Sequence, residues 1–397
     1  MHILILTKKF PYPLKDGESI AIMNLARNYA LAGNQVTMLS MTTPKHNQSV
    51  DEAEPELQGY IRFETVWVDT SIRIIQIPVN YFEFIPYHIK RFISPAYRQK
   101  LKSILLETKF DIIQLEGLFL APYIKIAKQY SEAKIVLRSH NIEGMIWQRY
   151  AKRETNILKK IFLQQQASKL LTYEIRSTKL YDAIVPISTA DHTFFKAHFP
   201  HDRIKYIPSG VDADNRFTET TIDFNTIYYL GALDWLPNKE GLQWFLRNVF
   251  PQVLQKNPAV RFHIAGRNPG KWTKTLKHEN IVFHGEIENA AHFIADKFIC
   301  IVPLLSGSGM KLKILEALSL GKHVVTTPLG AEGLPDEVQA YISIAEKEAD
   351  FAEKILSALK NIVRTREKAN TAARFVTHHL NNKILADAVL KFYKTIS

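Results

Sequence analysis

VPLLSGSGMKLKILEALSLGKHVV (residues 302–325) is the most informative segment of this chain. Its pattern predicts a buried strand, a glycine loop, a helix and a second strand, which is typical of α/β proteins. Glycine reaches positive φ without steric penalty. The loop residues Gly307, Ser308 and Gly309 can therefore turn their backbone N–H groups toward an anion.

Two lysines and one glutamate follow this loop. Lys311 and Lys313 stand where the helix begins, and the helix N-terminus adds partial positive charge, so a diphosphate would be matched electrostatically. Glu316 lies one turn further among apolar residues, where two vicinal sugar hydroxyls would supply the donors that a buried carboxylate needs. The segment indicates a nucleotide-sugar site, but an ordinary amphipathic helix with solvated lysines explains it equally well.

The composition is that of a globular protein with surplus positive charge. At 397 residues, two domains are expected. No apolar run approaches the roughly 20 residues of a membrane-spanning helix, and the amino-terminal residues predict a first strand rather than a secretory signal, so a cytoplasmic location is expected. Cys300, the single cysteine, is expected to be a buried, inert thiol. The net charge of +12 indicates a polyanionic partner.

Two segments carry much of the positive charge. Residues 148–180 contain eight Lys or Arg against two acids, with apolar residues at helical spacing, and predict a basic amphipathic helix or helix pair. Residues 79–100 interleave aromatic and basic side chains. Both patterns suit an anionic membrane surface, which makes a peripheral position at the inner face of the membrane a candidate location. A core-facing helix with a solvated basic face and, upstream, an acceptor groove or a plain core are the alternatives.

The predicted elements fall into two α/β halves. In the first half we expect strands at residues 2–7, 35–41, 61–68, 72–77, 111–115, 135–138 and 183–186, with helices from Ser19 to about Leu31 and at 96–108. In the second half we expect strands at 227–230, 261–265, 281–284, 298–303 and 323–326, and helices at 239–254, 290–296, 313–320, 349–368 and 371–395. This order predicts two doubly wound domains, residues 1–205 and 206–370, that face each other across a ligand-binding cleft.

Two loops in the first half carry further candidates. PYPLKDGES (residues 11–19) offers Gly17 and a helix N-terminus, but it does not match the G-x-G-x-x-G pattern of dinucleotide-dependent oxidoreductases. SHN (residues 139–141) places His140 and Asn141 just past a strand end, where functional side chains of this fold gather. A lone histidine is also often structural.

In their order along the chain, these segments resemble the family 4 (group 1) glycosyltransferases of the GT-B fold. The resemblance rests on FPYPLKDGES, RSHNIE, IPSGVDAD, YLGALDWLPNKEGLQWF, FHIAGRNP, IVFHGEI and SGSGMKLKILEALSLGKHVVTTPLGAEGL, and spans nearly the whole chain. It implies an enzyme of polysaccharide or lipid-linked glycan synthesis. Such an enzyme moves a sugar, with retention, from a UDP- or GDP-sugar to a hydroxyl of a glycan or lipid-linked acceptor, and no metal is expected.

Carried over residue by residue, the resemblance implies roles for individual side chains. The donor-binding residues would be Gly17, Gly231, Arg267, Gly285, Gly307, Ser308, Gly309 and Glu316. Glu316 would hold the ribose hydroxyls, and His140 would face the transferred sugar and align it. Lys311 and Lys313 would stabilise the leaving phosphate, and Asn141 would lie on the acceptor side. The helix at about 371–397 would pack back on the first domain.

Two departures from the family pattern leave other functions open. Ser308 stands where the E-x7-E pattern has its first glutamate, and Ala232 stands where many members have an arginine. A GT-B sugar-nucleotide epimerase and a non-catalytic nucleotide-sugar-binding relative therefore remain alternatives. A nucleic-acid binder is disfavoured, because the chain has no helix-turn-helix, zinc-ligand spacing or RNP-like aromatic signature.

Overall fold

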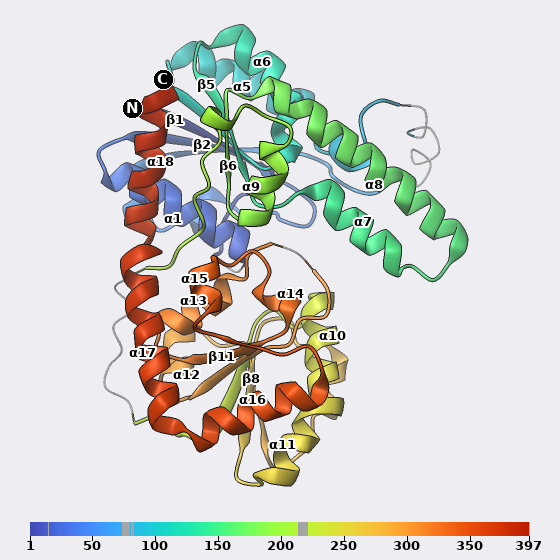
Figure 1. The fold of residues 1–397 in the computed structure, drawn as a ribbon. Coiled ribbons are helices and arrows are strands. Elements are labelled where there is room, and N and C mark those ends of the chain that lie inside the picture. Colours follow the sequence, from blue (N-terminus) through green and yellow to red (C-terminus); the bar gives the residue numbers. More distant parts are fainter. Residues whose placement is uncertain (15, 74–79, 81–82, 213–220, 308, 397) are drawn as a thin grey trace. The chain divides into compact units, whose positions relative to one another are not determined.

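The computed structural model describes residues 1–14, 16–73, 80, 83–212, 221–307 and 309–396 (Figure 1). The chain forms two compact units. The first contains Met1–Pro208 together with Lys383–Ser397, and the second contains Ser209–Asn382. The predicted boundary lies after residue 205. The last helix of the chain is thus part of the first unit, although the helix before it belongs to the second.

The first unit is built on a parallel six-stranded sheet in the order β3-β2-β1-β4-β5-β6. Its strands are β1 (His2–Thr7), β2 (Gln35–Thr42), β3 (Ile61–Trp67), β4 (Ile112–Glu116), β5 (Lys134–Ser139) and β6 (Ala183–Pro186). The inner strands are apolar and buried along their length, as both faces of a parallel sheet must be covered.

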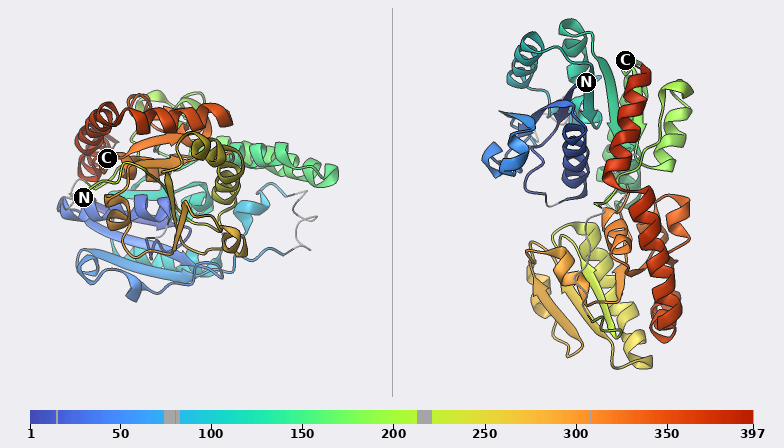
Figure 2. Two further views of the ribbon diagram at one scale, coloured as in Figure 1. Left: turned by 90° about the horizontal axis from the view of Figure 1, so that it is seen from below. Right: turned by 90° about the vertical axis from the view of Figure 1, so that its left-hand side faces the viewer.

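Helices cover both faces of this sheet. They are α1 (Gly17–Leu31), α2 (Pro55–Gln58), α4 (Tyr87–Lys90), α5 (Pro95–Glu107), α6 (Ile124–Tyr130), α7 (Glu143–Arg153), α8 (Ile157–Ser177), α9 (Thr189–Lys196) and α18 (Asn382–Ile396). Side chains of α1 and α18 pack against one face, and those of α5, α6, α8 and α9 against the other. Helices α7 and α8 form a hairpin that extends away from the sheet, as both Figure 1 and Figure 2 show.

The second unit repeats this architecture with the strand order β12-β11-β10-β7-β8-β9. Its strands are β7 (Thr226–Leu230), β8 (Arg261–Ala265), β9 (Ile281–Gly285), β10 (Ile299–Val302), β11 (His323–Thr326) and β12 (Ser343–Ile344). Its helices are α10 (Leu236–Trp244), α11 (Phe250–Lys256), α12 (Ala290–Ala295), α13 (Leu312–Ser319), α14 (Pro328–Ala331), α15 (Asp336–Gln339), α16 (Glu348–Lys360) and α17 (Ile362–His379).

Both sheets have the strand order of a doubly wound Rossmann fold. Numbered within its own unit, each sheet runs 3-2-1-4-5-6. The strand order therefore reverses between β1 and β4 in the first unit and between β7 and β10 in the second. Ligands of such sheets bind at the carboxyl ends of the strands beside this switch point. The residues at and after the ends of β1, β4, β7 and β10 are therefore candidates for ligand binding.

Most predicted elements are confirmed to within a few residues, but two helix starts are corrected. Asp16, not Ser19, caps α1: the Asp16 carboxylate accepts the Ser19 N–H at 3.0 Å, so the helix begins at Gly17. The predicted helix 239–254 begins earlier, at Leu236, so that Pro237 lies in its first turn. A five-residue π-helical segment, Phe245–Val249, interrupts it. Pro251 explains this interruption, because it has no N–H to donate to the carbonyl four residues before it.

The predictions for two other regions also need correction. The helices expected at 349–368 and 371–395 are three helices, because Asn361 leaves the helical region at φ −107° and ψ 54°. The chain also opens at Leu380–Asn382. There Val211 donates to the Leu380 carbonyl and accepts from the Asn382 N–H, at 2.9 and 3.0 Å, in place of helical bonds. Of the strand expected at 72–77, Ile72 and Arg73 are not in a strand, and the remainder lies outside the described residues.

Candidate functional site

Each switch point carries a group of polar side chains. We call the first the His140 site: Lys8, Lys9, Asp16, Glu18, Glu116, His140 and Glu143, all in the first unit. We call the second the Lys313 site: Tyr229, Gly231, Asn238, Lys313 and Glu316, all in the second unit.

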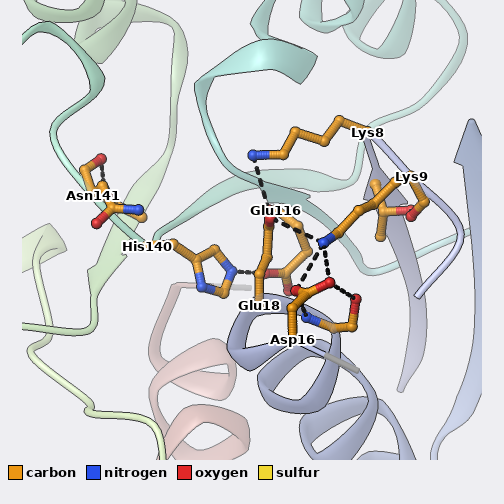
Figure 3. Close-up of polar contacts among 10 residues, drawn as sticks. Lys8, Lys9, Asp16, Glu18, Glu116, His140 and Asn141 are labelled. Carbon is orange, nitrogen blue, oxygen red and sulfur yellow. Dashed lines mark hydrogen bonds and ion pairs between the residues drawn. The ribbon is translucent and has the colours of Figure 1, made fainter. Parts of the chain in front are cut away.

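The His140 site is organised around a buried hydrogen bond between a histidine and a carboxylate (Figure 3). Glu116 is the last residue of β4, and His140 directly follows β5. The His140 Nε2 atom lies 2.5 Å from Glu116 Oε2. Glu116 is fully buried and His140 is 9% exposed. Since carboxylates are rarely buried unless they are paired, Glu116 is held by its partners.

Two lysines that follow β1 pair with carboxylates of the next helix. Lys8 lies 3.0 Å from Glu18, and Lys9 lies 2.7 Å from Asp16. Dashed lines mark both pairs in Figure 3. Burial would raise the pKa of Glu18, but Lys8, Lys9 and His140 outweigh it and lower this pKa to about 2. Glu18 is therefore ionised at neutral pH. The loop before α1 is thus fixed by charge pairs that also fix the position of Gly17.

A second carboxylate fixes the start of α7, just after His140. Glu174 of α8 accepts the backbone N–H groups of Glu143 and Gly144 at 3.1 and 3.0 Å. A Cβ on Gly144 would lie 2.6 Å from the Leu171 backbone, so only glycine allows α7 and α8 to approach this closely. Burial raises the pKa of Glu174 to about 8 and also raises that of Glu143. The electrostatic effect of His140 on Glu143 indicates that this carboxylate borders the site.

The Lys313 site joins the end of β7 to the first turn of α13. The Lys313 ammonium lies 3.2 Å from Asn238 Oδ1 and 4.8 Å from the centre of the Tyr229 ring. A Cβ built on Gly231 would meet Lys313 Nζ at 2.7 Å and the Tyr229 hydroxyl at 3.0 Å. A side chain at position 231 would therefore occupy the space beside the ammonium.

Burial perturbs the charges of this site. It lowers the pKa of Lys313 to about 8, although Cys300 and Glu316 oppose this effect. It raises the pKa of Glu316, with Lys313 acting in the opposite direction and Asp212 in the same one. Cys300 is buried, as predicted, and burial raises the pKa of its thiol to about 12. An incoming anion would restore the lysine charge, so this site is suited to phosphate.

Three glycines lie side by side where β7, β8 and β9 end. Gly231 donates to the Ala265 carbonyl at 3.2 Å, and Gly266 donates to the Gly285 carbonyl at 2.8 Å. A Cβ on Gly266 would lie only 1.8 Å from the Gly231 oxygen. Arg267 comes next, and within the described residues its buried Nε has no hydrogen-bond partner. This edge presents backbone and one guanidinium to a ligand.

The glycine loop before α13 is left-handed at both described glycines. Gly307 has φ 107° and Gly309 has φ 74°, whereas Ser308 lies outside the described residues. Lys311 is buried at the N-cap position of α13 and donates to the Gly309 carbonyl. The Lys311 ammonium thus binds the loop itself, whereas the Lys313 ammonium lies beside Gly231.

The structure therefore brings some of the predicted residues together and separates others. Gly231, Lys313 and Glu316 form one group, with Arg267 just past the end of β8 and Gly285 at the end of β9. Asn141 lies on the opposite side of His140 from Glu116 (Figure 3), so it is not part of the charge cluster. Sequence reasoning missed Glu116, although a polar residue at the end of the apolar run FDIIQLEG was a usable signal. It also missed the partners of Lys313.

Two negative findings apply to the described residues. No helix in the described ranges combines the length and apolarity needed to cross a bilayer. Within the same ranges, no group of three or more His, Cys, Asp or Glu side chains is placed to hold a metal ion.

Two family models match the chain. Residues 16–215 match the model described as Glycosyltransferase Family 4. Residues 224–361 match the model described as Glycosyl transferases group 1. A curated relative is a Klebsiella pneumoniae protein described as an uncharacterized 44.6 kDa protein in the cps region. It is 25% identical over 98% of this chain and 99% of its own.

Solved structures of similar fold cover the whole chain. Sucrose-phosphate synthase from Thermosynechococcus elongatus superposes with a TM-score of 0.73 at 15% identity, over 100% of this chain and 99% of its own. HepE from Anabaena in complex with UDP gives 0.69 at 13% identity, with both chains fully covered. WaaG, a glycosyltransferase involved in lipopolysaccharide biosynthesis, gives 0.65 at 14% identity, again with full coverage of both.

Proposed function

The chain belongs to glycosyltransferase family 4 and is a glycosyltransferase of the GT-B fold, and we propose that it transfers a sugar, with retention, from a UDP- or GDP-sugar to an acceptor hydroxyl. The acceptor in this proposal is a glycan or lipid-linked intermediate of polysaccharide synthesis. The observation that carries the proposal is the Lys313 ammonium beside Gly231, at the switch point of the second sheet.

Two observations support a nucleotide-sugar donor: the positive charge of the Lys313 site and the ligands of a solved structure of similar fold. HepE is described in complex with UDP and with UDP-glucose. In this chain Lys313, the N-terminus of α13 and Arg267 supply positive charge where a diphosphate would bind. Glu316, one turn along α13, is the carboxylate proposed to accept hydrogen bonds from two ribose hydroxyls. Its raised pKa reflects burial that such donors would offset.

The transfer step replaces one bond to the anomeric carbon with another. The bond from C1 to the leaving phosphate oxygen breaks, and a bond from C1 to the acceptor oxygen forms on the same face. The acceptor proton passes to the departing phosphate oxygen, and the nucleoside diphosphate leaves. Negative charge grows on that phosphate in the transition state, so Lys313 stabilises the transition state more than the bound donor. His140 acts as a hydrogen-bond partner that aligns the sugar.

A membrane-bound acceptor is supported by the tip of the α7–α8 hairpin. Three apolar residues at the start of α8 are exposed: Ile157 by 66%, Leu158 by 77% and Ile161 by 57%. Lys152 and Arg153 are exposed at the end of α7, directly across the turn. Apolar side chains flanked by cations suit the headgroup region of an anionic bilayer. Peripheral binding to the inner face of the membrane is therefore part of the proposed function.

A two-step experiment tests the enzymatic proposal. A thermal-shift screen against UDP- and GDP-sugars identifies a donor, because a ligand bound only by the folded chain raises the melting temperature. The stabilising donor is then incubated with lipid-linked glycan acceptors, and the product is analysed by NMR. Nucleoside diphosphate release with an anomeric configuration equal to that of the donor supports the proposal. An inverted product contradicts retention, and a freely isomerised sugar nucleotide indicates an epimerase.

A further inference from the structure

A chain of buried hydrogen bonds runs from the last helix of the protein to His140. Tyr393 of α18 and Tyr29 of α1 donate to Gln114 Oε1, at 2.6 and 3.1 Å. Gln114 Nε2 then donates to Glu116 Oε1, and the other oxygen of Glu116 meets His140 Nε2 at 2.5 Å. Gln114 and Glu116 are fully buried. They stand two residues apart on β4 and therefore on the same face of the sheet.

The direction of donation along this series of hydrogen bonds determines which ring nitrogen of a neutral His140 carries the proton. The tyrosine hydroxyls fill the acceptor positions of Gln114 Oε1, so the Gln114 amide group must face Glu116 as a donor. With one oxygen of Glu116 already accepting, an ionised carboxylate accepts from His140 as well. The proton of a neutral His140 then lies on Nε2. Its Nδ1, which has no hydrogen-bond partner in the described part of the chain, is left as an acceptor.

We infer that Glu116 is a positioning residue that holds His140 in the Nε2–H tautomer, so that Nδ1 accepts a hydrogen bond from a hydroxyl of the sugar being transferred. This inference rests on the proposed function only for the identity of that hydroxyl. A carboxylate that fixes one ring nitrogen is a common way to set the chemistry of the other. Gln114 and the two tyrosines hold Glu116 from one side, in a continuous series of hydrogen bonds that ends at His140.

Other charges also face His140 and its partner. Glu18 from α1 and Glu143 from α7 both interact electrostatically with the imidazole, and Lys8 faces these two carboxylates. Arg138, opposite Glu116 on β5, is buried and acts on Tyr29 and Tyr393. Of these groups, Glu116 alone has a hydrogen bond to the ring among the described residues, so it determines the tautomer.

The tautomer can be read without any activity. In protein labelled with 15N-histidine, the resonance lost in His140→Gln identifies His140 among the 14 histidines. At neutral pH we expect Nε2 to carry the proton and Nδ1 to be unprotonated. In Glu116→Gln the new amide can direct its NH2 group at Nε2, so the Nδ1–H tautomer should appear. An Nδ1–H tautomer in the wild-type protein, or an unchanged tautomer in Glu116→Gln, overturns the inference.

A double-mutant cycle separates positioning from general structural damage. With a nucleotide sugar that the wild type turns over, Glu116→Gln should lower kcat about 10- to 100-fold and leave the donor KM within about twofold. In a His140→Ala background the same change should have almost no further effect, because Glu116 acts through the ring. Additive losses, or a loss confined to KM, contradict the inference. If the wild type turns over no nucleotide sugar, the proposed function fails, while the tautomer experiment still decides the inference.

The tyrosine end of the chain has its own matched pair. Tyr393→Phe removes the hydroxyl that donates to Gln114 and keeps the ring. Tyr97→Phe removes an equally buried hydroxyl of the first unit, which donates to the Leu39 carbonyl at 2.8 Å. This hydroxyl takes no part in the hydrogen bonds that lead to His140. We expect Tyr393→Phe, but not Tyr97→Phe, to increase the Nδ1–H fraction of His140. Equal effects of the two variants would show that the helix is not coupled to the histidine.

Discussion

Replacing Gly231 with alanine should weaken binding of a nucleoside diphosphate and leave the fold almost unchanged. The added Cβ would lie 2.7 Å from Lys313 Nζ, 3.0 Å from the Tyr229 hydroxyl and 3.2 Å from Asn238 Nδ2. Ordinary contacts begin near 3.5 Å, so the ammonium must move by about 0.8 Å. Because Nζ is the end of a flexible side chain, folding should cost no more than about 1 kcal/mol.

The loss of affinity follows from what the displaced ammonium would contact. A hydrogen bond to a charged group contributes about 1.5–3 kcal/mol. Losing one such bond to phosphate should therefore raise the Kd for UDP by about 10- to 150-fold. We expect the melting temperature of the unliganded variant to fall by no more than a few degrees.

Two other glycines serve as controls. Gly266→Ala places its Cβ 1.8 Å from the Gly231 backbone oxygen, which cannot move away, so it should destabilise the fold by several times the cost of Gly231→Ala. Gly59→Ala meets the Glu56 oxygen at an ordinary 3.5 Å and should change neither property. Calorimetric titration with UDP and thermal unfolding of all three variants test the reasoning. Wild-type UDP affinity in Gly231→Ala, or unfolding as severe as in Gly266→Ala, would refute it.

Three further predictions concern charge and surface. Since the pKa of Lys313 is about 8, the protein without ligand loses the charge of Lys313 as the pH rises through that value, so UDP affinity should fall between about pH 7 and pH 9. Lys313→Arg should remove this pH dependence. A wild-type Kd that does not change with pH would contradict the assignment. The pKa of Glu18 is lowered to about 2, so its stabilisation is present above the unfolded value near 4.3 and disappears as pH falls toward 2. Glu18→Gln should thus lower the free energy of unfolding, measured with urea, by about 1–2 kcal/mol at pH 7 and by far less near pH 2. Glu107→Gln, at an exposed carboxylate, is the control and should not show this loss. The triple substitution Ile157→Ser, Leu158→Ser and Ile161→Ser should abolish sedimentation of the protein with anionic vesicles. Leu106→Ser, at a residue 65% exposed in α5, should not. If the triple variant binds the vesicles as well as the wild type does, the hairpin has no part in membrane binding.

The strands and the glycine loop could be predicted because local patterns specify them. Buried parallel strands read as apolar runs, and the loop before α13 carries its glycines at positions with positive φ. Lys313 and Glu316 follow at helical spacing, so their shared position could be expected. The wrong helix starts had local causes, the Asp16 cap and Pro237, whereas the break at residues 380–382 depends on a longer-range contact. Asn361 and the pairing of Val211 with residues 380–382 break the last helices, and no local sequence pattern records that pairing.

The site of the first unit was harder to predict. His140 stands at a strand end and was recognised, but Glu116 comes from a neighbouring strand of the sheet, 24 residues earlier. The contact between these residues exists because β4 and β5 pair in register, with Glu116 opposite Arg138. Tyr393 reaches Gln114 from the other end of the chain. Spacing along one sequence cannot show such contacts, because they depend on how the strands are ordered.

Calorimetric titration of the wild type, Lys313→Ala and Glu316→Gln with UDP and GDP tests the central claim most directly. We predict that the wild type binds one of these nucleotides and that each substitution weakens binding at least about tenfold, since each removes a hydrogen bond involving a charged group. Binding of equal affinity in all three proteins would contradict the claim that Lys313 and Glu316 hold a nucleoside diphosphate. So would the absence of binding to either nucleotide in a correctly folded wild-type protein.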